Sequence, residues 1–253
     1  MALHEVNVLE IYEKLLHKMY GNKVQNLVSQ LKIIEELALS IDDICDGESG
    51  VTVARRLVNT LAELLKLDAD LLSIILKEGK RIFEENAKVH VIALELEKAP
   101  TITSTLAYLI EGYEARASLV ELYSKISRAF GFPIDDFEAR NTVAAYFVID
   151  DLKDLKEDIK SGSPNFVLAL NRNKFLNSEV KKLLLEIAFL HFLEGIADKS
   201  IVLDLIKTYR KYEEKIIFED EGEKAYTKPI SLANVSATPV MLSNIGKIIP
   251  PKQ

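Results

Sequence analysis

Two clusters of aspartate residues stand out because each follows a long apolar run. The chain contains IDDICD and, about a hundred residues later, IDDLKD, so that each cluster reads D-D-x-x-D. On a helix, side chains four residues apart lie on the same face. Asp42 is therefore expected to point the same way as Asp46, and Asp150 the same way as Asp154. Grouped carboxylates of this kind are oxygen ligands for a divalent cation such as Mg²⁺.

Each cluster is predicted to close a helix, which is an electrostatically unfavourable place for acids. The C-terminal end of a helix already carries partial negative charge, so several carboxylates there need positive compensation. The residues before the clusters, LALS and AAYFV, are largely apolar, whereas a solvated helix face would carry polar residues. A single D-D-x-x-D is common on protein surfaces, but two copies in this setting favour a metal site.

The elements that would position the clusters are predicted to be helices. Apolar residues recur at spacings of three and four, as in the run Val28, Leu31, Ile34, Leu37 and Ile41. No convincing alternating strand pattern is found. The fold class is therefore predicted to be all-α. The predicted helices cover residues 5–20, 23–46, 52–66, 69–97, 102–130, 135–160, 176–196 and 199–218.

A change of pattern divides the chain near residue 219. Residues 1–218 are predicted to form one helical domain, and residues 219–253 an irregular C-terminal extension. The extension holds four of the seven prolines of the chain and loses the helical periodicity. It also contains many apolar residues, so we expect it to pack along the helical body or to cover an opening.

Composition excludes several classes of function. The 253 residues carry a formal net charge of −7, with acids and bases interspersed, which argues against nucleic-acid binding. A single cysteine, Cys45, rules out an internal disulfide. No signal peptide and no membrane span are recognised, so a soluble cytoplasmic protein is expected. The four histidines are dispersed, which argues against zinc, and no phosphate-binding glycine loop is present.

At the clusters the sequence resembles the trans-prenyltransferases, the polyprenyl diphosphate synthase family. IDDICD is similar to the first Asp-rich motif of that family, and FVIDDLKD to its second motif, F-Q-x-x-D-D-x-x-D. The following EDIKSGSPN is similar to the G-K-D-L-x-x-G-K-x-T segment of the family, with an aspartate, an apolar residue and a glycine in register. The resemblance covers roughly residues 24–170.

This resemblance implies a fold, a cofactor and an activity. The fold would be the class I isoprenoid synthase bundle, with an active-site cavity between helices and the two motifs facing each other across its mouth. Mg²⁺ ions would bridge the motifs to the diphosphate of an allylic prenyl substrate, and the protein would be a homodimer. The catalytic residues and Mg²⁺ ligands implied are Asp42, Asp43, Asp46, Asp150, Asp151 and Asp154.

The basic residues of the family are only partly matched. The N-terminal G-G-K-x-x-R-P segment, which binds isopentenyl diphosphate in the family, has no equivalent here. Much of the basic set for a second diphosphate is thus missing, which favours one diphosphate substrate with a different acceptor over ordinary chain elongation. The remaining candidates for substrate contacts are Arg55, Arg56, Arg116, Lys153 and Lys160.

Three functions are therefore compatible with the sequence. The first is a prenyltransferase that transfers the prenyl group to isopentenyl diphosphate or to another acceptor. The second is a terpene cyclase-like enzyme, although the second motif lacks the N-D-x-x-S-x-x-x-E pattern typical of cyclases. The third is a non-catalytic subunit or prenyl-lipid-binding member of the fold. Tyr108, Tyr113, Tyr123 and Tyr146 are expected in the core or at the rim, where one of them would line a prenyl pocket.

Overall fold

The structure is a computed structural model that describes residues 7–45, 50–161 and 165–213. Within these ranges every regular element is a helix, so the all-α prediction is confirmed for them. None of the helices described is both long enough and apolar enough to span a membrane. The elements are α1 (Val8–Tyr20), a 3₁₀ helix η1 (Gly21–Val24), α2 (Gln25–Cys45), α3 (Val51–Leu64), α4 (Ala69–Ala87), α5 (Val89–Lys98), α6 (Ile102–Arg116), α7 (Leu119–Ala129), α8 (Asp136–Ser161), α9 (Phe166–Arg172), α10 (Ser178–Glu194) and α11 (Lys199–Glu213).

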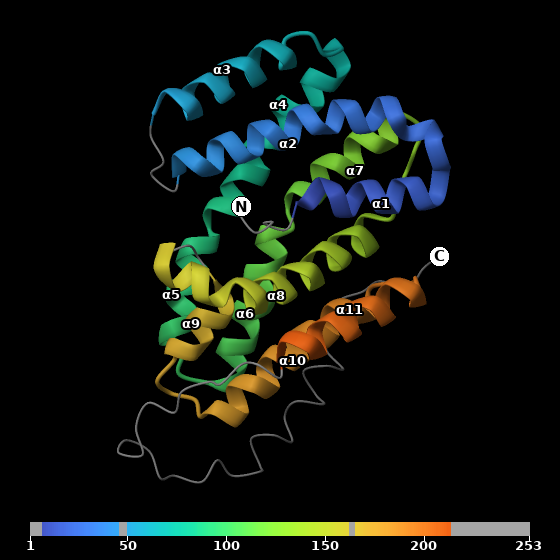
Figure 1. The fold of residues 1–253 in the computed structure, drawn as a ribbon. Helices are drawn as coiled ribbons and strands as arrows, with labels where there is room; N and C mark the ends of the chain where they lie inside the picture. The colour runs from blue at the N-terminus through green and yellow to red at the C-terminus, as the bar shows by residue number, and fades with distance from the viewer. Residues whose placement is uncertain (1–6, 46–49, 162–164, 214–253) are drawn as a thin grey trace. The chain divides into compact units, whose positions relative to one another are not determined.

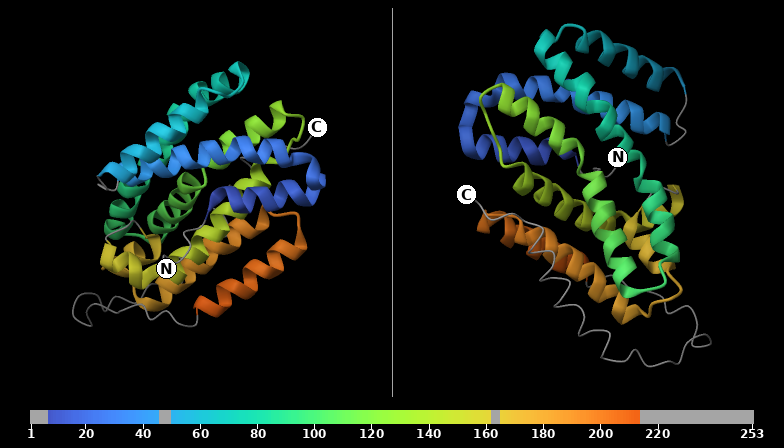
Figure 2. Two further views of the ribbon diagram at one scale, coloured as in Figure 1. Left: turned by 45° about the horizontal axis from the view of Figure 1, so that its top comes forward. Right: turned by 180° about the vertical axis from the view of Figure 1, so that it is seen from behind.

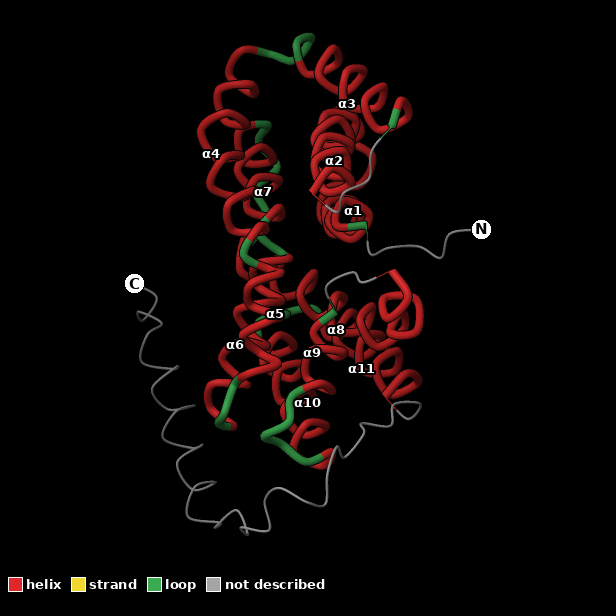
Figure 3. Tube along the Cα trace, turned by 90° about the vertical axis from the view of Figure 1, so that its left-hand side faces the viewer, coloured by secondary structure: helices red, strands yellow, loops and turns green. Residues whose placement is uncertain are grey.

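Five helices lie side by side in a row. In Figure 3 the row runs from top to bottom in the order α3, α2, α1, α8 and α11, and each of these helices packs against the next. The chain reverses at η1, so that α1 runs antiparallel to α2, while α8 runs in the same direction as α2 (Figure 1). The C-terminal ends of α2 and α8 therefore lie along the same edge of the row, on the left in Figure 1.

The other helices cover one side of this row, as the two views of Figure 2 show. Helix α7 packs against α4, α8 and α1, and α6 packs against α5, α8 and α10. The short α9 fills the space between α5 and α8. One continuous apolar core joins the elements, because the inward faces of these helices contribute buried residues to it.

Helix starts follow from side-chain caps that the sequence supplies. The side chains of Asn7, Asn165 and Asn177 each accept a hydrogen bond from a backbone N–H in the first turn of α1, α9 and α10, respectively. Thr101 and Ser104 form a capping box at the start of α6. Such caps satisfy N–H groups that the helix itself leaves unpaired.

Helix boundaries differ from the prediction in three places. The stretch 69–97 forms two helices that meet at Lys88, and the stretch 102–130 forms two that meet at Ala117 and Ser118. Neither break contains glycine or proline, so the local sequence does not predict that the helix ends there. Both residues of the second break are small and buried, and the Ser118 hydroxyl hydrogen-bonds the carbonyl of Ile82 on α4. The third difference is α9, which was not predicted. The isoprenoid synthase arrangement itself stays a prediction, and the boundary expected near residue 219 lies outside the described residues.

Candidate functional site

The second aspartate cluster lies on α8 and is divided between two faces of that helix. The prediction that it closes the helix is wrong, because α8 continues to Ser161. Asp150 and Asp154, four residues apart, lie on one face with Lys153 between them, as their spacing predicts. Asp151 points instead into the protein, and only 2% of the residue is exposed to solvent. The three acids of this motif therefore do not share one site.

The carboxylate of Asp151 is fully engaged by other groups of the protein. One oxygen pairs with the guanidinium of Arg116, at the end of α6. The other oxygen accepts a hydrogen bond of 3.1 Å from the Tyr113 hydroxyl and one of 2.7 Å from the backbone N–H of Phe166, the first residue of α9. Burial raises the pKa of Asp151, and these donors oppose the rise. Asp151 thus ties α6, α8 and α9 together.

Asn165 fixes the chain that follows the cluster. Its amide nitrogen donates to the backbone carbonyl of Asp151 at 2.9 Å and to the carboxylate of Asp158 at 2.7 Å. Its amide oxygen caps α9 by accepting from the N–H of Leu168 at 2.8 Å. The asparagine therefore holds the start of α9 against the acidic end of α8.

On the face of α8 that carries Asp150 and Asp154, the ammonium of Lys153 lies between their two carboxylates. Its ammonium is 3.7 Å from Asp150 Oδ1 and 3.4 Å from Asp154 Oδ2. The pKa of Asp150 is raised to about 7, chiefly because the carboxyl is buried; the charges of Asp154 and Asp151 contribute to the rise, while those of Arg116 and Lys153 oppose it. A carboxylate that resists ionisation at neutral pH marks a place where additional positive charge would be stabilising.

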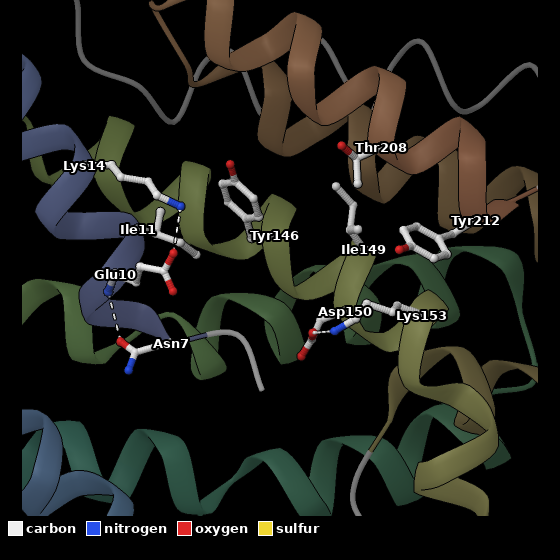
Figure 4. A pocket seen from close by; sticks show the side chains of 10 residues that line it. All are labelled: Asn7, Glu10, Ile11, Lys14, Tyr146, Ile149, Asp150, Lys153, Thr208 and Tyr212. Carbon is white, nitrogen blue, oxygen red and sulfur yellow. Dashed lines mark hydrogen bonds and ion pairs between the residues drawn. The ribbon is translucent and has the colours of Figure 1, made fainter. Parts of the chain in front are cut away.

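Asp150 also lines a pocket between α1, α8 and α11, shown in Figure 4. The pocket has a volume of about 220 Å³. Its wall combines apolar, aromatic and charged side chains: Asn7, Glu10, Ile11, Lys14, Tyr146, Ile149, Asp150, Lys153, Thr208 and Tyr212. Lys14 is paired with Glu10 at 3.0 Å, so both cations of the wall already have carboxylate partners.

The first aspartate cluster lies at the end of α2. Asp42 and Asp43 belong to the last turn of that helix, but their side chains are outside the described part of the chain, as is the whole of Asp46. Because α2 and α8 run the same way on either side of α1, the C-terminal ends of these two helices lie along the same edge of the row (Figure 1), and the second cluster lies about two to three turns before the end of α8. Whether the carboxylates converge is a prediction that the described residues leave open.

The candidate basic residues are spread over several helices. Arg116 is committed to Asp151, and its guanidinium also stacks 4.2 Å from the ring centre of Phe147. Arg55 and Arg56 lie on α3, where Arg55 is exposed and Arg56 half-buried. Lys160 is in the last turn of α8, with its side chain outside the described part. Of the five candidates, Lys153 is the one that the structure brings to the Asp150 pocket.

A preformed site of three metal-binding side chains is not found among the side chains that the structure describes. Asp150 and Asp154 nevertheless provide two neighbouring carboxylates. This fits Mg²⁺, which proteins often hold through one or two carboxylates while substrate phosphates and water complete its coordination. Asp151 does not fit that role, because its oxygens are taken by protein donors.

Some residues of the site were not predicted from the sequence. Lys14, Thr208 and Tyr212 come from α1 and α11, which lie far from α8 in sequence, and no motif marks them. Tyr146 was expected in the core or at a rim, and it lies half-buried in the pocket wall.

Comparisons with models of known protein families, with curated proteins and with solved structures find no match for this chain.

Proposed function

We propose that this protein is a Mg²⁺-dependent prenyltransferase that ionises an allylic prenyl diphosphate and transfers the prenyl group to isopentenyl diphosphate or to another acceptor. The observation that carries the proposal is the pairing of Asp150 and Asp154 around Lys153, beside a pocket, on the C-terminal half of α8. The resemblance of the two aspartate motifs to those of the trans-prenyltransferases also supports the proposal.

The charge balance around Asp150 supports cation binding. Asp150 is 8% exposed and has a pKa of about 7, which means that Arg116 and Lys153 compensate its negative charge poorly. Asp42 and Asp43 belong to the last turn of α2, whose C-terminal end lies along the same edge of the row as that of α8. Bound Mg²⁺ would neutralise the charge that develops on the diphosphate as it leaves.

The chain's own side chains have separate tasks in this proposal. Asp150 and Asp154 hold the cation, and Lys153 exchanges a carboxylate partner for a phosphate oxygen. Ile11 and Ile149 provide apolar walls that exclude water from the reactive carbon. The pocket volume is below the ~300–1,000 Å³ that is usual for ligand sites, so the pocket suits the diphosphate end of the substrate rather than its whole prenyl chain.

One observation favours a second candidate, a non-catalytic member of the fold that binds a prenyl diphosphate. The pairing of Asp151 with Arg116 removes one motif carboxylate and one candidate phosphate-binding cation from the open face of α8. A protein of this kind would bind the diphosphate with Mg²⁺ but release no pyrophosphate. The homodimer implied by the resemblance remains a prediction under both candidates.

The test is pyrophosphate release from geranyl, farnesyl and geranylgeranyl diphosphates with Mg²⁺, each with and without isopentenyl diphosphate. Asp150→Asn and Asp154→Asn are expected to reduce release at least tenfold, and Asp70→Asn, an exposed acid on α4, serves as the matched control. Release that needs the second substrate identifies chain elongation, whereas release without it identifies a cyclase or a hydrolase.

A binding measurement separates the two candidates. If Mg²⁺ and a prenyl diphosphate together raise the melting temperature of the wild type but not of Asp150→Asn, the site binds the ligand. Binding without pyrophosphate release would support the non-catalytic candidate. A melting temperature unchanged by Mg²⁺, prenyl diphosphate or both would reject both candidates.

A further inference from the structure

Helix α3 presents an apolar stripe to the outside of the protein. The stripe consists of residues spaced alternately by three and four, all of them exposed: Val51, Ala54, Val58, Leu61 and Leu65. Val51 and Leu65 are 74% and 80% exposed, and Val58 and Leu61 are 63% and 45% exposed. A spacing of three and four keeps the five side chains on one side of the helix.

The position of α3 leaves this stripe open along its whole length. The helix lies at the end of the row and packs against α2 (Figure 3). It does so with a different face, which carries the buried residues Val53, Thr60 and Leu64. Large apolar side chains exposed together in this way mark an interaction surface more often than chance exposure does.

The charges beside the stripe indicate the kind of partner. Helix α3 itself, residues 51–64, contains two basic residues, Arg55 and Arg56, and a single acid, Glu63, so it is net positive in a chain whose formal charge is −7. Arg55 borders the stripe on the helix, and Lys66 follows in the turn after Leu65. The acids Asp68 and Asp70 lie beyond the stripe at the start of α4. Lys66 is paired with Glu63 at 2.5 Å, but both side chains are more than half exposed, so the pair is weak.

We propose that α3 docks on the surface of a lipid bilayer containing acidic phospholipids. An apolar stripe bordered by basic residues is the pattern of helices that lie in the membrane interface, with the apolar side chains among the acyl chains and the cations at the headgroups. Basic residues near such a surface are attracted to its acidic headgroups over a distance that salt screening limits. This docking goes beyond the proposed function and does not depend on it.

A second copy of the chain fits the stripe less well. The stripe spans about two heptads, whereas stable coiled coils usually need three or four. The border offers Arg55 and Lys66 to a symmetric partner, and these would meet no matching row of acids on an identical helix. Charge therefore favours an acidic membrane over self-association.

Co-sedimentation of the full chain with vesicles tests the proposal. The wild type is expected to bind vesicles of phosphatidylcholine and phosphatidylserine, and to bind phosphatidylcholine alone about tenfold more weakly. The double variant Val58→Ser with Leu61→Ser is expected to lose about tenfold in binding, and Arg55→Ser to lose a smaller factor that shrinks as salt is added.

A matched control exists on α5, where Val91 and Leu94 have the same residue types, the same spacing and similar exposure, 59% and 53%. Val91→Ser with Leu94→Ser should bind vesicles as the wild type does. The proposal is overturned if the wild type does not bind acidic vesicles or if both double variants bind equally. It is also overturned if the wild type is a dimer that does not bind vesicles and the α3 double variant is a monomer, because a second copy of the chain would then occupy the stripe.

Discussion

The carboxylate of Asp151 forms an ion pair with the guanidinium of Arg116 inside the protein, between α8 and α6. Both residues belong to the set that the sequence assigns to metal or substrate. The pair is joined by the Tyr113 hydroxyl and the N–H of Phe166, so α6, α8 and α9 all meet at one carboxylate. This part of the motif therefore holds helices together, whereas the carboxylates of Asp150 and Asp154 contact Lys153 beside the pocket.

Removing Asp151 is expected to destabilise the protein strongly. Asp151→Ala leaves Arg116 without its carboxylate partner and leaves the N–H of Phe166 and the Tyr113 hydroxyl without their acceptor. Breaking one side of a buried pair costs about 3–5 kcal/mol, so the free energy of unfolding in urea should fall by about that amount. Asp154→Ala, in the same motif but on the outer face, is the control. Equal stability of the two variants would contradict the structural role given to Asp151.

The raised pKa of Asp150 predicts a pH dependence of stability without metal. Because the folded protein favours the protonated form, Asp150 contributes stability below its unfolded pKa of about 3.9, and this contribution is lost as the pH rises through about 7. Asp150→Asn should thus be more stable than the wild type at about pH 8, by as much as about 4 kcal/mol, and the advantage should shrink toward about pH 4. Urea denaturation in chelating buffer measures this, and an advantage that is constant with pH would contradict it.

Glu35 on α2 gives a second pH-dependent position, away from the pocket. It is buried among α1, α2 and α7, and accepts hydrogen bonds from the Tyr123 hydroxyl and from the backbone N–H of Leu9. Burial raises the pKa of Glu35, and the two neutral donors only partly oppose the rise. The stability that its protonated form supplies is present at acid pH and is lost as the pH rises through this raised pKa.

The variant Glu35→Gln should therefore match the wild type near pH ~4 and exceed it in stability near pH ~8, because the amide stays neutral. Thermal denaturation at the two pH values is the measurement. Glu36→Gln, at the exposed neighbouring position, controls for the loss of one negative charge. If Glu35→Gln is less stable than the wild type at the higher pH, the carboxylate is stabilised by something other than these two donors.

Gly112 is expected to tolerate no larger residue, because α6 and α9 approach each other there. A Cβ at this position would lie less than 3.0 Å from three atoms of the Phe166 ring, which is fully buried. Gly112→Ala gains about 1 kcal/mol of helix propensity but overpacks the core by about 1–3 kcal/mol, so a net loss of up to about 2 kcal/mol is predicted. In a double-mutant cycle, Phe166→Leu should make room and reduce the cost of the alanine. A purely additive cycle would rule out this contact as the cause.

Periodicity and spacing predicted the helices and the shared direction of Asp150 and Asp154, because both properties are local. The fate of Asp151 could not be predicted in that way, since Arg116 and Tyr113 reach it from 35 and 38 residues away. The break at Ser118 likewise depends on a contact with α4 rather than on a helix-breaking residue. Lys14 and Tyr212 belong to the pocket only because α1 and α11 pack on either side of α8.

Helix α1 lies between α2 and α8, the two helices that carry the aspartate motifs. Packed helices have axes about 8–10 Å apart, so two successive packings place the axes of α2 and α8 about 16–20 Å from each other if the three helices lie in one plane. A magnesium–oxygen bond is only about 2 Å long, so a bare ion is too small to link the two motifs. If both motifs hold cations, as the proposed function requires, the thickness of one helix favours an elongated polyanion with a cation at each end over any single ion.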